Sequence, residues 1–341
     1  MLPLPPGLLT SVAGPVAPLT GQSALTGWSA DVPALVVVSV VSAAYLLAVR
    51  RAGARGEPWS ATASAWFLIG GMGSLLVVTC SFLGTYSRVL FWPLAVQDVL
   101  FVTLVPVGMT LGRPLALWRT VCPQRDARLR LPSALRSLFG FPLTGSVLAV
   151  VLLLLVYTTG WDQARLEHPA LLALTRLLLL AAGCSFLWPL IGVDDGTGHT
   201  SYPLRALIAF VDGLLDALPG LAVLGTGHVI AADYYARVAR TWGPTLPEAQ
   251  KTGGTAMIVL SEIVGLPALL ALLVAWVRRD AQQARDIDAA LDVIDAAEIA
   301  ARGATAAGTG LEGDVLHRPW WEVDPGPLAD RAARFEHRPD G

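Results

Sequence analysis

Residues 62–83, TASAWFLIGGMGSLLVVTCSFL, form a run of 22 positions without a charged side chain. A helix rises about 1.5 Å per residue, so a run of this length crosses the roughly 30 Å hydrocarbon core of a bilayer. Six further apolar runs along the chain are long enough to do the same, and the sequence therefore predicts seven membrane-spanning helices. Their predicted bounds are residues 32–49, 62–83, 89–111, 143–159, 170–192, 204–230 and 255–277.

The composition of the whole chain agrees with a membrane protein and argues against several other classes. Of the 341 residues, 54% are hydrophobic and 15% are charged, and the mean hydropathy is +0.58. Soluble domains contain about 25% charged residues, and disordered chains are far less apolar than this one. The net charge of −2 offers no basic field for a nucleic acid, and three cysteines form neither a disulfide framework nor a zinc finger. Backbone groups in lipid must bond internally and no alternating strand pattern occurs, so we expect an all-α bundle.

The basic residues between the predicted spans indicate the orientation, because cytoplasmic loops carry the excess of Arg and Lys. One side holds thirteen basic residues: Arg50, Arg51, Arg55, Arg113, Arg119, Arg125, Arg128, Arg130, Arg136, Arg205, Arg278, Arg279 and Arg285. The other side holds five: Arg88, Arg165, Arg237, Arg240 and Lys251. We expect the first side to be cytoplasmic, which places the N-terminus outside and the C-terminus inside.

The chain divides into four regions by composition. Residues 1–31 are rich in Pro and Gly and lack the basic start of a signal peptide, so we expect a short external lead before a membrane domain of residues 32–277. Residues 278–302 are charged and Ala-rich, with apolar residues at near-helical spacing. This pattern predicts a cytoplasmic amphipathic helix on the membrane or a partner, with a solvated extension of the last span as the alternative. Residues 303–341 are punctuated by Gly and Pro, and we expect them to be disordered.

Ionisable residues inside the predicted spans are the main candidates for a functional site, because such side chains are costly in lipid and face the protein interior. They are Asp98, Arg176, Asp212, Asp216 and Glu262. Helix rise places four of them at similar depth, and the i, i+4 spacing puts Asp212 and Asp216 on one helix face. One interpretation is a structural ion-pair network in which Arg176 bridges Asp98 and Asp216. The other is a polar cavity for a cation, a proton or a ligand of a partner, since four acids facing one Arg need further neutralisation.

Other chemistry has weaker candidates. His168 and His228 fall at span ends on the same side of the membrane and form a weak candidate pair for copper or zinc, but no two histidines have metal-binding spacing. The sequence contains no phosphate-binding loop, nucleophile elbow or H-E-x-x-H motif, and no paired nucleophile and base. We therefore do not expect an enzyme.

Several blocks together resemble the cytochrome c oxidase assembly factor CtaG family. They are VQD at residues 96–98, FLWPLIGVD at 186–194, YPLR at 202–205, ADYY at 232–235 and SE at 261–262, and they occur in the family's order and spacing. The resemblance covers roughly residues 28 to 285. It implies a multi-pass plasma-membrane protein that supports maturation of haem–copper oxidase, with oxidase subunits as partners and copper handling as a chaperone-like activity.

The resemblance also exposes a departure from the family. Members of the family place histidines in helices three, five and six as plausible copper ligands. The corresponding positions here are Leu94, Asp98, Arg176, Leu178 and Asp216. Of the family's polar residues at this depth, only the acid Glu262 is kept. Since imidazole suits copper better than carboxylate does and a guanidinium repels a cation, we expect a degenerate copper site. The alternative function is a small transporter, coupled to a proton or cation, that uses the acidic residues.

Overall fold

The computed structural model describes residues 17–122, 142–191, 202–238 and 240–309, and these are helical with short connections and no strand. The all-α prediction is therefore confirmed for this part of the chain. The first elements are α1 (Gly21–Thr26), α2 (Val32–Ala54), α3 (Ala61–Ala65), the π-helical η1 (Trp66–Gly73), α4 (Ser74–Cys80), α5 (Phe82–Tyr86), α6 (Phe91–Val102), α7 (Leu104–Leu111) and α8 (Pro114–Val121). The later elements are α11 (Pro142–Thr158), α12 (Trp161–Glu167), α13 (Pro169–Ile191), α14 (Tyr202–Gly225), α15 (Ala232–Val238) and α16 (Leu246–Thr309).

Five helical stretches of the described chain are long and apolar enough to cross a membrane. They are Val32–Ala54, Ala61–Tyr86, Phe91–Val121, Pro169–Leu190 and Ala206–Gly225. A sixth is obtained if α11 and α12 count as one span, although the chain bends by 79° between them. The structure thus supports a multi-pass membrane protein with five or six spans. The seventh predicted span, residues 255–277, lies within α16, and its crossing stays a prediction.

The second predicted span is not a plain α-helix, because its centre is the π-helical η1. This segment packs backbone against backbone on α7, and the glycines at the contact make the approach possible. A Cβ added at Gly108 would lie 2.1 Å from the carbonyl carbon of Gly70 and 2.2 Å from the backbone nitrogen of Gly71. Only a residue without a side chain fits there, so the small residues of η1 and α7 fix how these two helices pack.

The third predicted span is broken between α6 and α7 at Thr103, and Pro106 explains the break. Proline has no N–H, so Pro106 cannot donate to the carbonyl of Val102 four residues earlier. That carbonyl instead lies against α13, where a Cβ added at Gly183 would be 2.1 Å from the Val102 oxygen. The break therefore allows α13 to approach α6 and α7 closely.

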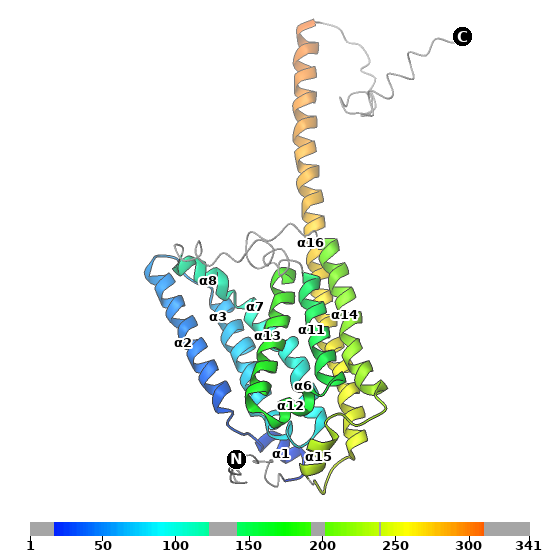
Figure 1. Ribbon diagram of the computed structural model, residues 1–341. Helices are drawn as coiled ribbons and strands as arrows, with labels where there is room; N and C mark the ends of the chain where they lie inside the picture. The colour runs from blue at the N-terminus through cyan, green and yellow to red at the C-terminus, as the bar shows by residue number, and fades with distance from the viewer. Residues whose placement is uncertain (1–16, 123–141, 192–201, 239, 310–341) are drawn as a thin grey trace, which may run out of the picture. The chain divides into compact units, whose positions relative to one another are not determined.

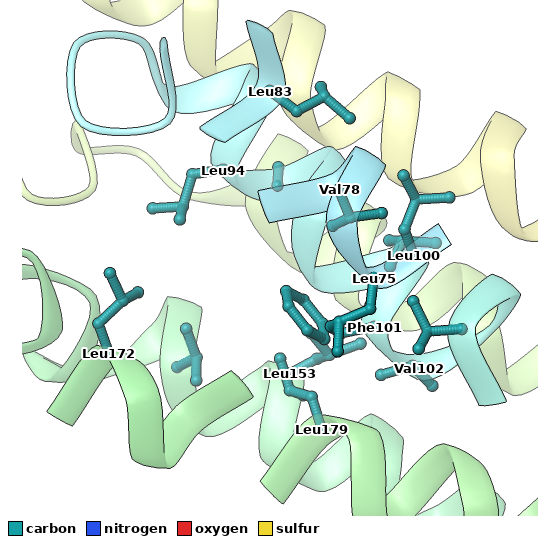
Figure 2. Packing of buried hydrophobic residues seen from close by; sticks show 14 of the residues in the cluster. Leu75, Val78, Leu83, Leu94, Leu100, Phe101, Val102, Leu153, Leu172 and Leu179 are labelled. Carbon is teal, nitrogen blue, oxygen red and sulfur yellow. The ribbon is translucent and has the colours of Figure 1, made fainter. Parts of the chain in front are cut away.

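The main hydrophobic core joins helices of the first unit from α2 to α16. Leu75 of α4, Phe101 of α6, Leu153 of α11 and Leu179 of α13 are all buried in one cluster. Figure 2 shows the side chains converging around Phe101. Large apolar side chains are also exposed on α4, α11 and α13, as expected for surfaces that face lipid tails.

The chain forms two compact units, Met1–Val277 and Arg278–Gly341. Within the first unit, α1, α12 and α15 lie at one end of the helices and α8 lies at the other (Figure 1). Helix α1 belongs to the expected external lead, whose residues 1–16 fall outside the described part. In the second unit the helix α16 continues to Thr309, and residues 310–341 fall outside the described part. The binding of residues 278–302 to a membrane or a partner and the disorder of the tail stay predictions.

Candidate functional site

Asp98 is held in the interior of the first unit by two side chains from other helices. The residue is 1% exposed, and the Tyr157 hydroxyl donates to its Oδ2 over 2.5 Å. The Arg165 guanidinium donates to both carboxylate oxygens, over 3.0 Å to Oδ1 and 2.7 Å to Oδ2. This bidentate geometry is among the strongest arrangements an ion pair can adopt.

Arg165 reaches Asp98 because the chain turns sharply after α11. Gly160 precedes α12, and the 79° bend brings α12 across the end of the helices. The indole of Trp161 donates to the Thr175 hydroxyl of α13 over 2.9 Å, which anchors the start of α12. One turn later Arg165 is fully buried, with its guanidinium 5.5 Å from the ring centre of Tyr157.

A second carboxylate shares the same guanidinium. Arg165 donates from its Nε to Asp162 Oδ1 over 2.8 Å and from its terminal nitrogen over 2.6 Å. Two buried carboxylates therefore share one guanidinium, and we call the group Asp98, Tyr157, Asp162 and Arg165 the α12 ion-pair group. Among the described residues, Asp162 Oδ2 has no hydrogen-bond partner, and neither does the buried hydroxyl of Tyr235. Burial and the nearby Asp162 charge raise the pKa of the Tyr235 phenol well above its usual value, so this hydroxyl keeps its proton.

The prediction that Arg176 bridges Asp98 and Asp216 is wrong. Arg176 instead donates to Asp31 Oδ2 over 2.8 Å, and both side chains are about one fifth exposed. Asp31 also caps the start of α2 by accepting from the backbone N–H of Ala34. Arg176 thus links α13 to the beginning of α2. Hydropathy places Arg165 in a loop, so it did not identify this residue as the partner of Asp98. The i, i+3 spacing of Asp162 and Arg165 after Gly160 was a usable signal of an ion pair on a short helix.

The remaining three predicted site residues come together at a different place. Asp212 and Asp216 of α14 and Glu262 of α16 all line one cavity of about 130 Å³. Helices α11 and α13 contribute Ser146 and Phe186 to the same wall. The expected single cluster of five residues is therefore divided into the α12 ion-pair group, the Arg176–Asp31 pair and this acid-lined cavity.

Among the described residues, no three His, Cys, Asp or Glu side chains are arranged to hold a metal ion. His168 is exposed and ends α12, while the exposed His228 lies in the connection between α14 and α15. A site made by these two histidines alone stays a prediction.

The connection near His228 is held by the side chain of Gln250 from α16. The side-chain oxygen of Gln250 accepts from the backbone N–H of Ile230 over 2.8 Å. Its amide nitrogen donates to the carbonyls of Val223 and His228, each over 3.2 Å. Gln250 therefore satisfies three backbone groups where α14 ends, and its role is structural.

Comparison with known proteins finds one family and several curated relatives that resemble this chain. The model of the cytochrome c oxidase caa3 assembly factor family matches residues 43–279. The chain is 26% identical over 277 residues to uncharacterized protein Mb0105 of Mycobacterium bovis and, equally, to uncharacterized protein MT0111 of Mycobacterium tuberculosis. Each alignment covers 77% of this chain and 41% of the relative. Uncharacterized protein ML1998 of Mycobacterium leprae is 24% identical over 255 residues, which is 72% of this chain and 38% of the relative.

The chain thus spans about two fifths of the length of these curated relatives, and no solved structure matches it. The family match covers more than half of the chain. It includes every residue of the three charged groups described above except Asp31. This chain belongs to the cytochrome c oxidase caa3 assembly factor (CtaG) family.

Proposed function

We propose that this chain acts in the plasma membrane as a non-enzymatic, chaperone-like factor that supports assembly of cytochrome c oxidase. The family match over residues 43–279 is the observation that carries the proposal. The described helices fit it, because five or six of them are suited to a bilayer, where oxidase subunits would be the partners. The alternative of a small transporter coupled to a proton or a cation finds no support in the family assignment.

We also propose that the copper site is degenerate. At the position of one expected histidine, Asp98 already binds Arg165 and Tyr157. At another, Arg176 binds Asp31 and would repel a cation. Carboxylates are harder ligands than imidazole, so Asp216 is a poor substitute for a copper-binding histidine. These contacts support a scaffold that assists assembly without holding copper tightly.

The orientation proposed here places the α8 end of the first unit in the cytoplasm, with residues 255–277 as a seventh span. The cytoplasmic excess of basic residues supports this choice. Arg55 contributes to the packing at that end, since it donates to the carbonyl of Thr120 over 3.1 Å. The same orientation puts α12, α15 and the predicted histidine pair on the outer side.

Two measurements test the proposals separately. Deletion of the gene in its native host is expected to lower the haem a absorbance of the oxidase, and expression of this chain is expected to restore it. An unchanged haem a signal would refute a role in assembly. Elemental analysis of the purified protein, incubated with copper and dialysed, is expected to show less than one copper per chain, whereas a stoichiometric copper would refute the degenerate site.

A further inference from the structure

Two buried oxygens beside the α12 ion-pair group lack a hydrogen-bond partner. Asp162 is fully buried, and its Oδ1 accepts two hydrogen bonds from Arg165, whereas its Oδ2 accepts none from the described residues. Tyr235 of α15 is 4% exposed, and its hydroxyl has no partner in the described part of the chain either. Buried polar atoms are nearly always paired, because an unpaired one loses its hydrogen bonds to water on folding. Both oxygens therefore need a partner that the described side chains do not supply.

The two oxygens belong to helices that pack against each other. Helices α12 and α15 are in contact at one end of the first unit (Figure 1). The charge of Asp162 acts on the Tyr235 phenol more strongly than that of Arg165 or Asp98, and it contributes to the raised pKa of the phenol. All three charges are buried and Coulomb energy falls with distance, so Asp162 lies nearest. The two oxygens are thus neighbours, yet no hydrogen bond joins them directly.

A polar cavity of about 340 Å³ lies next to these groups. Gln163 of α12 and Asp233 of α15 line it, together with Tyr157, which is itself a member of the α12 ion-pair group. A water occupies about 30 Å³ in the liquid, so the cavity has room for solvent. It therefore provides a source of water beside the contact between α12 and α15.

The chemistry of the two unpaired oxygens selects the kind of ligand. A phenol hydroxyl donates and an ionised carboxylate only accepts, so a water can accept from Tyr235 and donate to Asp162 at the same time. A metal ion would need further ligands, and in the described chain no three His, Cys, Asp or Glu side chains converge on one point. A water molecule is the ligand that satisfies both atoms without another charged side chain.

We propose that one buried water joins α15 to the α12 ion-pair group, accepting a hydrogen bond from the Tyr235 hydroxyl and donating one to Asp162 Oδ2. Tyr235 is then a positioning residue, because through the water it keeps the Asp162 carboxylate directed toward Arg165. The inference does not depend on the proposed role in oxidase assembly, so either proposal can fail alone.

The direction of the stability change in Tyr235→Phe tests the proposal. Removal of an unpaired buried hydroxyl would stabilise the fold or leave it unchanged, whereas removal of a hydroxyl that holds a water destabilises it. In reversible unfolding of the full chain in mixed micelles, we expect Tyr235→Phe to raise the unfolding equilibrium constant about five- to tenfold. An unchanged or lower constant would overturn the proposal. Tyr234→Phe is the matched control on the same helix, because the main charges near that phenol are Arg88 and Arg237, and its constant should equal that of the parent.

Two further measurements identify the partner and the ligand. In an Asp162→Ala background the effect of Tyr235→Phe should largely disappear, and an equal effect with and without Asp162 would overturn the link between them. An experimental structure at a resolution that shows ordered waters should have a peak within about 3.2 Å of both oxygens. A direct hydrogen bond between the two side chains, or a melting temperature that rises with sodium chloride but not with choline chloride, would overturn the assignment of a water.

Discussion

Replacement of Arg165 by leucine is the most direct test of the α12 ion-pair group. Arg165 supplies two hydrogen bonds to Asp98 and two to Asp162, and its side chain is fully buried. Without it, Asp98 keeps only the Tyr157 hydroxyl, and Asp162 keeps no side-chain donor among the described residues. Breaking a buried ion pair from one side typically costs about 3–5 kcal/mol, and we expect Arg165→Leu to lower the free energy of unfolding by that amount.

Reversible unfolding in mixed micelles, followed by tryptophan fluorescence, measures this change. The triple variant Arg165→Leu, Asp98→Asn, Asp162→Asn should recover most of the loss, because it leaves no buried charge without a partner. Arg176→Leu is the matched control, since its pair with Asp31 is partly exposed and should contribute about 1 kcal/mol or less. If Arg165→Leu is no less stable than Arg176→Leu, the assignment of Arg165 as the central cation is refuted.

Two further predictions concern packing and pH. Gly108→Ala should lower the free energy of unfolding by about 1–3 kcal/mol in the same assay, because its Cβ would lie 2.1 Å from the carbonyl carbon of Gly70. The control Gly53→Ala should be nearly neutral, because no atom lies within 4 Å of the added Cβ. Equal effects of the two substitutions would contradict the close approach of η1 and α7. The backbone N–H and the hydroxyl of Thr245 donate to the Glu248 carboxylate, and these hydrogen bonds lower the pKa of Glu248. The stability that the ionised Glu248 contributes is therefore present at neutral pH and is lost as the pH falls through the lowered pKa. The difference in unfolding midpoint between the parent and Glu248→Gln should therefore shrink in acid, and a constant difference would contradict this.

The apolar helices could be predicted from the sequence because hydropathy is a local property. Their breaks could not, since these depend on contacts between distant segments. The π-helical turn of η1 follows from its packing on α7, and the sharp turn after α11 follows from the anchoring of Trp161 on Thr175. Pro106 was visible in the sequence, but its effect depends on the approach of Gly183 to the carbonyl of Val102.

The candidate site was predictable in its residue types and not in its pairing. The cost of a charge in lipid correctly indicated that Asp98 is buried. Its partner is 67 positions away in a segment that hydropathy places outside the bilayer. The depth of a residue along its helix does not tell which way its side chain points around the helix axis. Depth alone therefore could not show that Arg176 points toward Asp31 and not toward Asp98.

The division of charge among the three groups also limits where a histidine for copper could be introduced into this chain. Asp98 and Asp162 depend on Arg165 for their neutralisation, so a histidine at position 98 would remove one acceptor from a guanidinium that is fully buried. The acid-lined cavity has no such constraint, because no ion pair within the described chain engages Asp212, Asp216 or Glu262. A histidine at position 216 would therefore disturb packing less than one at position 98, yet it would lack imidazole neighbours. The ion-pair group thus opposes a histidine at position 98 of α6, whereas no ion pair of the described residues opposes one at position 216 of α14.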